Sequence, residues 1–214
     1  AGVVVVNGLG LDAFLESVVE GARRTGAVLV VAAEGLGTGP GGAANAGDPH
    51  LWQDPLLAIH YVERIRDGLA SADPGNAPVY QANSDAYVAE LRQLDLEIAQ
   101  TLAEVPAQHR RLVTMHDAFG HFAARYRWET SALALSDASQ VSPADVAAVI
   151  ERVRGDGIPA VFVEPQFGRA VMEEVARQAG VRVGTLYSDA LDDKVTTYVG
   201  MMRFNAKSLA EHLK

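Results

Sequence analysis

Short aliphatic runs alternate along the chain with segments of helical periodicity, and this alternation restricts the possible folds more than any other feature. The runs are rich in valine, leucine and alanine and are bounded by turn residues, which is typical of buried strands. They lie at 3–6, 28–31, 112–115, 132–135, 160–163 and 181–186. Strands that alternate with helices predict an α/β fold with parallel sheets and flanking helices.

Two helices carry clear start signals. Asp54-Pro55 and Ser142-Pro143 each combine an N-cap residue with a proline in the first helical position. The Gly- and Ala-rich stretch at 35–47 has no apolar periodicity and is expected to be a mobile loop.

A long amphipathic helix is predicted at 83–105. Its apolar residues are spaced three or four apart, and neither glycine nor proline interrupts it before Pro106. These residues are Tyr87, Leu91, Leu94, Ile98 and Leu102. The fold class expected is therefore two α/β lobes joined by one long linker helix, with an N-terminal lobe at 1–82, the linker at 83–105 and a C-terminal lobe at 106–214.

The composition excludes several classes of site. The formal charge of −9 and the absence of a basic run argue against nucleic acid as a partner. With no cysteine in the chain, disulfides, thiolate zinc sites and cysteine nucleophiles are excluded. A metal would have to be bound by nitrogen and oxygen atoms.

The opening stretch "VVVVNGLGLD" admits two interpretations. Gly8, Gly10 and Ala13 satisfy a loose dinucleotide fingerprint, and Glu34 ends the next strand as a ribose-binding acid would. That pattern is common by chance. The alternative is a tight turn in which the glycines serve the backbone and close helix packing rather than a pyrophosphate.

Four side chains stand where ligands usually bind, beyond the carboxyl ends of strands or in the loop entering a helix. His116 follows the strand at 112–115, Glu164 follows the strand at 160–163, Asp189 follows the strand at 181–186, and His50 lies in "DPHLWQDP". Two imidazoles and two carboxylates suit a zinc or manganese site.

Each of these residues also has a purely structural interpretation. His50 could hydrogen-bond its own turn, His116 could cap a helix beginning near Ala118, and Glu164 and Asp189 could be N-caps or partners of an arginine. The other histidines are not expected to be ligands: His121 would lie on a different helix face from His116, and surface or partly packed positions are expected for His60, His109 and His212.

Five motifs in order resemble one family over nearly the whole chain. "DPHLWQDP", "YQANSDAYVAELRQLD", "RRLVTMHDAFGHFAARY", "FVEPQF" and "YSDAL" are similar to the zinc and manganese solute-binding proteins of bacterial ABC importers, cluster A-I. The resemblance implies two α/β lobes, a rigid linker helix and a metal bound by four side chains. It makes His50 the second family ligand, His116 the third and Asp189 the fourth.

The first family ligand belongs to an Asp-x-His-x-Tyr-x-Pro segment that would precede "VVVVNGL", so an N-terminal segment is expected to be missing, together with the signal peptide. The resemblance favours the tight turn over a nucleotide site. The chain departs from the family pattern at three places. It has no histidine at 35–47, it has His121 where tyrosine is usual, and it has Arg127 where glycine is usual.

The function expected is therefore zinc capture outside the cytoplasm for an ABC permease, with Glu164 orienting a ligand or closing the cleft. Manganese is the second choice of metal. If the histidine of the missing first family ligand is counted with His50 and His116, three imidazoles and one carboxylate suit tetrahedral zinc. A periplasmic monomer, with a periplasmic metal donor as a further partner, completes the expectation. The rivals are a metallohydrolase with Glu164 as general base and a metal-dependent adhesin on the cell surface.

Overall fold

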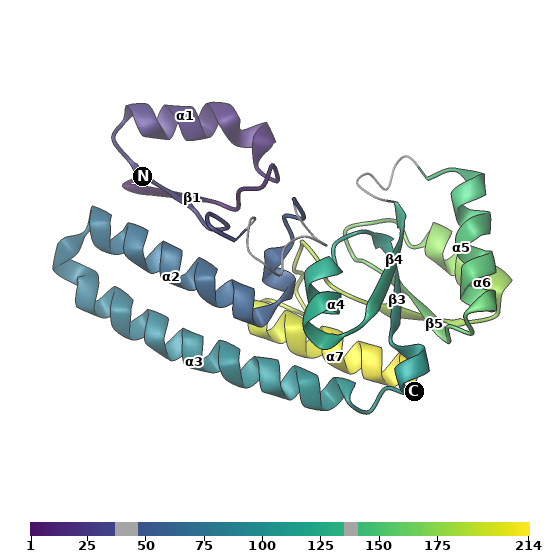
Figure 1. The fold of residues 1–214 in the computed structure, drawn as a ribbon. Coiled ribbons are helices and arrows are strands. Elements are labelled where there is room, and N and C mark those ends of the chain that lie inside the picture. Colours follow the sequence, from purple (N-terminus) through teal and green to yellow (C-terminus); the bar gives the residue numbers. More distant parts are fainter. Residues whose placement is uncertain (37–46, 135–140) are drawn as a thin grey trace. The chain divides into compact units, whose positions relative to one another are not determined.

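The computed structural model describes residues 1–36, 47–134 and 141–214, which form two compact units, Ala1–Asp95 and Leu96–Lys214 (Figure 1). Most of the stretch at 35–47, expected to be a mobile loop, and Leu135 at the end of the fourth predicted strand lie outside the described residues. No helix in the described ranges combines the length and apolar character needed to cross a membrane.

The N-terminal unit contains one pair of parallel strands. The strands β1 (Val3–Val6) and β2 (Val28–Val31) align Val3 with Val28. The remaining elements are η1 (Ala13–Leu15), α1 (Glu16–Arg24), η2 (Leu51–Gln53), α2 (Pro55–Ala72), η3 (Pro74–Asn76) and most of α3 (Ala77–Leu102).

Helix α2 approaches β2 closely at a glycine. A Cβ atom on Gly68 would lie 2.1 Å from Cγ2 of Val30, so only glycine allows this packing. The helix begins as predicted, since the Asp54 side chain accepts a hydrogen bond from Leu56 N at 2.8 Å and Pro55 is the first residue.

The opening turn is built from left-handed backbone. Gly8, Leu9 and Gly10 have φ values of 93°, 54° and 86°, and a Cβ on Gly8 would lie 2.7 Å from Val31 Cγ1. Glycine is therefore required for a tight turn against β2, which is the role that the family resemblance implied, except that the neighbour is a strand rather than a helix.

The C-terminal unit contains two further parallel pairs. The strands β3 (Arg111–His116) and β4 (Glu129–Ala134) pair with Leu112 opposite Thr130, and β5 (Ala160–Val163) and β6 (Arg182–Thr185) pair with Ala160 opposite Arg182. The helical elements are η4 (Ala107–His109), α4 (Gly120–Tyr126), α5 (Pro143–Gly155), α6 (Ala170–Ala179) and α7 (Tyr198–Leu213).

The core of this unit explains the aliphatic runs. Strands β3 and β5 lie near each other, and all four β5 residues are buried. The side chains of Val113, Val161 and Val163 pack with residues of α5 and α6. Helix α5 begins with the predicted Ser142 N-cap, which forms a reciprocal capping box with Asp145.

The long helix begins and ends earlier than the predicted 83–105. Pro78 lies in its first turn, where a proline costs no hydrogen bond, so the helix starts at Ala77 and stops at Leu102. Its predicted apolar face is buried at Leu91, Leu94, Ile98 and Leu102, each at most 3% exposed. The division between the two units falls inside this helix. Its role as a linker, with lobes at 1–82 and 106–214, stays a prediction.

Candidate metal centre

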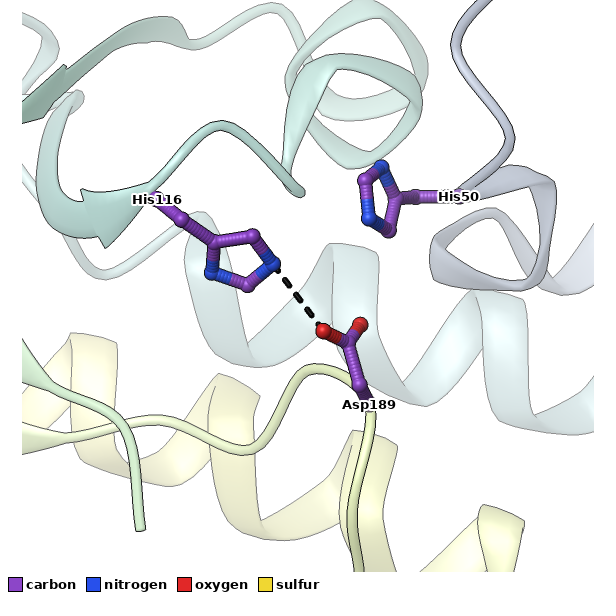
Figure 2. Close-up of side chains that lie close together, drawn as sticks. All are labelled: His50, His116 and Asp189. Atoms are coloured by element: carbon purple, nitrogen blue, oxygen red, sulfur yellow. Dashed lines mark ion pairs between the residues drawn. The ribbon is translucent and has the colours of Figure 1, made fainter. Parts of the chain in front are cut away.

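His116 lies at the end of β3 and faces two carboxylates. Its Nδ1 atom is 2.7 Å from Glu164 Oε2. Its Nε2 atom is 3.0 Å from Asp189 Oδ2, an ion pair that is drawn in Figure 2. The imidazole also stacks edge-on against Phe167, with ring centroids 4.9 Å apart. Because α4 begins at Gly120 and takes no side-chain cap, the capping interpretation of His116 is wrong.

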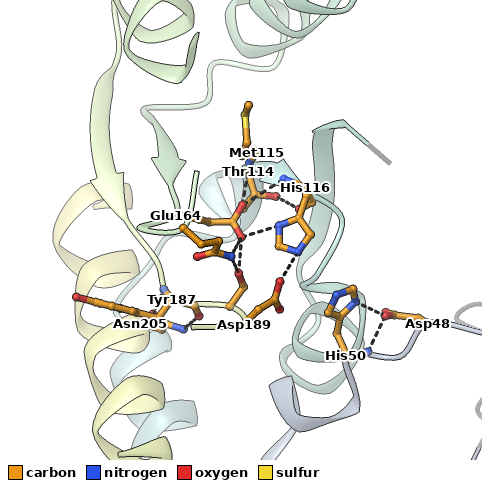
Figure 3. Close-up of polar contacts among 11 residues, drawn as sticks. Asp48, His50, Thr114, Met115, His116, Glu164, Tyr187, Asp189 and Asn205 are labelled. Atoms are coloured by element: carbon orange, nitrogen blue, oxygen red, sulfur yellow. Dashed lines mark hydrogen bonds and ion pairs between the residues drawn. The ribbon is translucent and has the colours of Figure 1, made fainter. Parts of the chain in front are cut away.

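Glu164 directly follows β5 and is held by several donors (Figure 3). Its Oε1 accepts hydrogen bonds from the backbone N–H groups of Met115 at 3.1 Å and His116 at 3.2 Å. Its Oε2 accepts from the Ser188 hydroxyl at 2.5 Å and from Gln166 Nε2 at 3.5 Å. The side chain is completely buried. These four hydrogen-bond donors hold the carboxylate in position against His116.

Asp189 lies in the loop after β6, and Asn205 on α7 holds the backbone of that loop. Asn205 Oδ1 accepts from Tyr187 N at 2.8 Å, and Asn205 Nδ2 donates to Tyr187 O at 2.7 Å. The Asp189 side chain is 36% exposed, whereas that of His116 is 9% exposed. The carboxylate can therefore reach an ion arriving from solvent while its backbone stays anchored.

The electrostatics of His116 favour a cation at this place. Burial lowers the pKa of the imidazole, but hydrogen bonds and charge interactions with Asp189 and Glu164 outweigh it and raise the pKa to about 9. Two carboxylates that stabilise a proton on this ring also stabilise a divalent cation at the same nitrogen.

His50 belongs to the N-terminal unit and is the N-cap of η2. Its Nδ1 is hydrogen-bonded to Asp48 Oδ1 at 2.7 Å, and the same oxygen accepts from His50 N at 3.0 Å. The ring stacks edge-on against Trp52 with centroids 5.3 Å apart. The turn-bonding interpretation of His50 is therefore correct for Nδ1.

The structure thus brings His116, Glu164 and Asp189 together in one unit and places His50 in the other. Sequence reasoning did not single out Asp48, Gln166, Ser188 or Asn205. The first three lie within two residues of a predicted site residue, a proximity that could have marked them. Asn205 carries no such signal.

Comparison with known proteins identifies relatives of this chain. The family model described as zinc-uptake complex component A, periplasmic (ZnuA), matches residues 1–212. The chain belongs to this family. ZnuA-family members are metal-binding receptors of ABC transporters, so the hydrolase alternative is wrong and the chain is not an enzyme.

Individual relatives are named for different metals. The manganese-binding lipoprotein MntA of Halalkalibacterium halodurans is 31% identical over 218 residues, which cover 100% of this chain and 72% of MntA. The iron-binding protein YfeA of Yersinia pestis is 30% identical over 217 residues, 99% of this chain and 70% of YfeA. The solved structure of the periplasmic zinc-binding protein TroA from Treponema pallidum matches with a TM-score of 0.90 and 28% identity, covering 100% of this chain and 81% of TroA. The two-lobed α/β fold is therefore that of the TroA-like receptors.

Proposed function

We propose that this ZnuA-family receptor captures zinc in preference to manganese, and that His50, His116 and Asp189 are ligands of one ion. The contact of His116 with Asp189 carries this proposal. Their Nε2 and Oδ2 atoms are 3.0 Å apart, and one zinc ion at about 2.0–2.2 Å from each atom can bridge that distance. His50 would add a second imidazole, binding through Nε2 because Asp48 is hydrogen-bonded to Nδ1.

Zinc is favoured because imidazole outnumbers carboxylate in this set. Nitrogen ligands bind zinc more tightly than manganese, whereas manganese prefers more oxygen ligands and a higher coordination number. The relatives are named for manganese, iron and zinc, so the preferred metal has to be measured on this protein itself. Glu164 takes no part in coordination and orients His116 from Nδ1.

The loaded protein delivers its ion to the permease of an ABC importer outside the cytoplasm, in the periplasm, where it acts as a monomer. A periplasmic metal donor is a further partner in this proposal. Relatives named as a periplasmic protein and a lipoprotein support the location.

Direct competition between zinc and manganese tests the metal. We expect zinc to displace manganese from the protein, and an equal or reversed preference would make it a manganese receptor. Alanine at His50, His116 or Asp189 should weaken zinc binding, whereas the matched control His121→Ala on α4 should not. If a ligand variant keeps the wild-type affinity, that residue does not bind the ion.

A further inference from the structure

We propose that Asp48 and Asn7 are positioning residues for His50: Asp48 sets the ring to offer Nε2, and not Nδ1, to the metal, and Asn7 holds the turn that carries the ring. This inference rests on the proposed function, since it concerns one of its ligands. It also gives a role to the opening "NGL" turn, which is not used by the proposed metal ligands.

Asp48 fixes the hydrogen on the His50 ring. An ionised carboxylate only accepts hydrogen bonds, so the 2.7 Å contact places the ring hydrogen of a neutral His50 on Nδ1 and leaves the lone pair on Nε2. The same Oδ1 atom accepts from the His50 backbone at 3.0 Å. Because Pro49 has no N–H, the intervening residue cannot compete for this oxygen.

Asn7 fixes the turn that carries His50. Its Nδ2 donates to Pro49 O at 3.0 Å and to Gly8 O at 3.1 Å, and its Oδ1 accepts from the Tyr61 hydroxyl at 2.6 Å. One side chain therefore joins the end of β1, the turn before His50 and helix α2. The left-handed backbone at Gly8 follows directly after Asn7, so the glycine turn helps to hold this junction.

The same device occurs in the C-terminal unit. Nδ1 of His116 faces Glu164 as Nδ1 of His50 faces Asp48. Metal-binding histidines usually donate their second ring N–H to a carboxylate or carbonyl, which fixes the tautomer and raises the basicity of the ligand nitrogen. Two histidines on separate units that share this arrangement point to Asp48 as the counterpart of Glu164.

The tautomer of His50 in metal-free protein is the first test. Imidazole ¹⁵N resonances, recorded at a pH where His50 is neutral, show which nitrogen carries the hydrogen. We expect Nδ1–H in the wild type, a shift toward Nε2–H in Asp48→Ala, and recovery of Nδ1–H in Asp48→Asn, which keeps an acceptor oxygen. An unchanged tautomer in Asp48→Ala would overturn the proposal.

Zinc affinity is the second test, and Asp67→Asn is the matched control because it removes an exposed carboxylate of the same unit. Asp48→Ala should lose about 10- to 100-fold in affinity, and the control should lose nothing. Equal losses would show that Asp48 acts through its charge alone and would overturn positioning, as would a wild-type affinity in Asp48→Ala.

Asn7→Ala tests the second residue. It should weaken zinc binding while the Nδ1–H tautomer stays, because the Asp48 contact remains. Tyr61→Phe, which removes only the hydroxyl that donates to Asn7, should give a smaller loss in the same direction. Wild-type affinity in Asn7→Ala would remove Asn7 from the proposal. If the wild-type protein binds neither zinc nor manganese, the proposed function fails, whereas the tautomer measurement still decides the Asp48–His50 contact.

Discussion

The Nδ1 atom of His116 lies 2.7 Å from Oε2 of Glu164, a carboxylate with a fully buried side chain. A buried charge is costly unless donors satisfy it, and here two backbone N–H groups, a hydroxyl and an amide do so. Glu164 is therefore anchored whether or not a metal is present. The carboxylate that faces Nδ1 of His50 is less buried, since the side chain of Asp48 is 18% exposed.

Replacing Glu164 by glutamine tests this anchoring. The amide keeps the shape of the side chain but removes its charge, so it stabilises a positive His116 less and makes the ligand nitrogen less basic. We expect zinc affinity to fall about 10- to 100-fold, measured by titration calorimetry. Glu173→Gln, at a half-exposed position on α6, is the control, and equal effects in both variants would contradict the role of Glu164.

The stability of the metal-free protein should depend on pH through His116. Its folded-state pKa of about 9 lies above the ordinary 6.5, so the stabilisation is fully present below pH 6.5 and is lost as pH rises through 9. The difference corresponds to about 3 kcal/mol in the free energy of unfolding. Denaturant titrations between pH 6 and 10 should show this loss in the wild type and a smaller one in His116→Ala.

Zinc affinity should change in the opposite direction over the same pH range. The ion must displace the proton from His116 Nε2, so affinity rises with pH until about 9, and binding at pH 7 releases about one proton from this residue. Calorimetry in buffers of different ionisation enthalpy measures the number released. A value that does not fall in His116→Ala would show that this imidazole does not bind the ion.

Local signals explain which parts of the fold could be predicted from the sequence. The parallel strands were predicted within a few residues, because buried parallel strands are continuous aliphatic runs whichever neighbours they have. The prediction of a helix at 83–105 missed the first residues of α3, which include Pro78, although proline is tolerated in a first helical turn.

The candidate site was predicted only as far as it lies in short motifs. His116 ends a strand, and Glu164 and Asp189 each follow one, so the sheet edge brings these residues together. Asn205 could not be found this way, because its partner Tyr187 is 18 residues away and only the packing of α7 brings the two together. Asn7 could not be predicted for the same reason, because its partner Pro49 is 42 residues away in the sequence.

Asn205→Ala should lower both stability and metal affinity. Asn205 is 1% exposed and satisfies the N–H and C=O groups of Tyr187, so alanine leaves two buried backbone groups without this partner. Each lost partner costs about 1–3 kcal/mol, and the Asp189 loop loses its anchor. Thermal unfolding and zinc titration measure the two effects. Asn76→Ala, which removes an exposed asparagine at the end of η3, should leave zinc affinity unchanged.

Arg127 follows α4 with φ 59° and ψ 52°, in the left-handed region, and its N–H donates to Ala123 O. This is the helix-ending geometry that glycine favours, and a side chain there costs about 1–2 kcal/mol. Glycine also gives the unfolded chain more freedom, which offsets about 0.4–1 kcal/mol. We therefore expect Arg127→Gly to raise the free energy of unfolding by about 0.5–1 kcal/mol. Arg125→Gly, inside the same helix, should instead destabilise the protein by about 1 kcal/mol or more. Chemical denaturation of the three proteins measures both changes, and a loss of stability in Arg127→Gly would show that contacts of the arginine side chain outweigh the backbone strain.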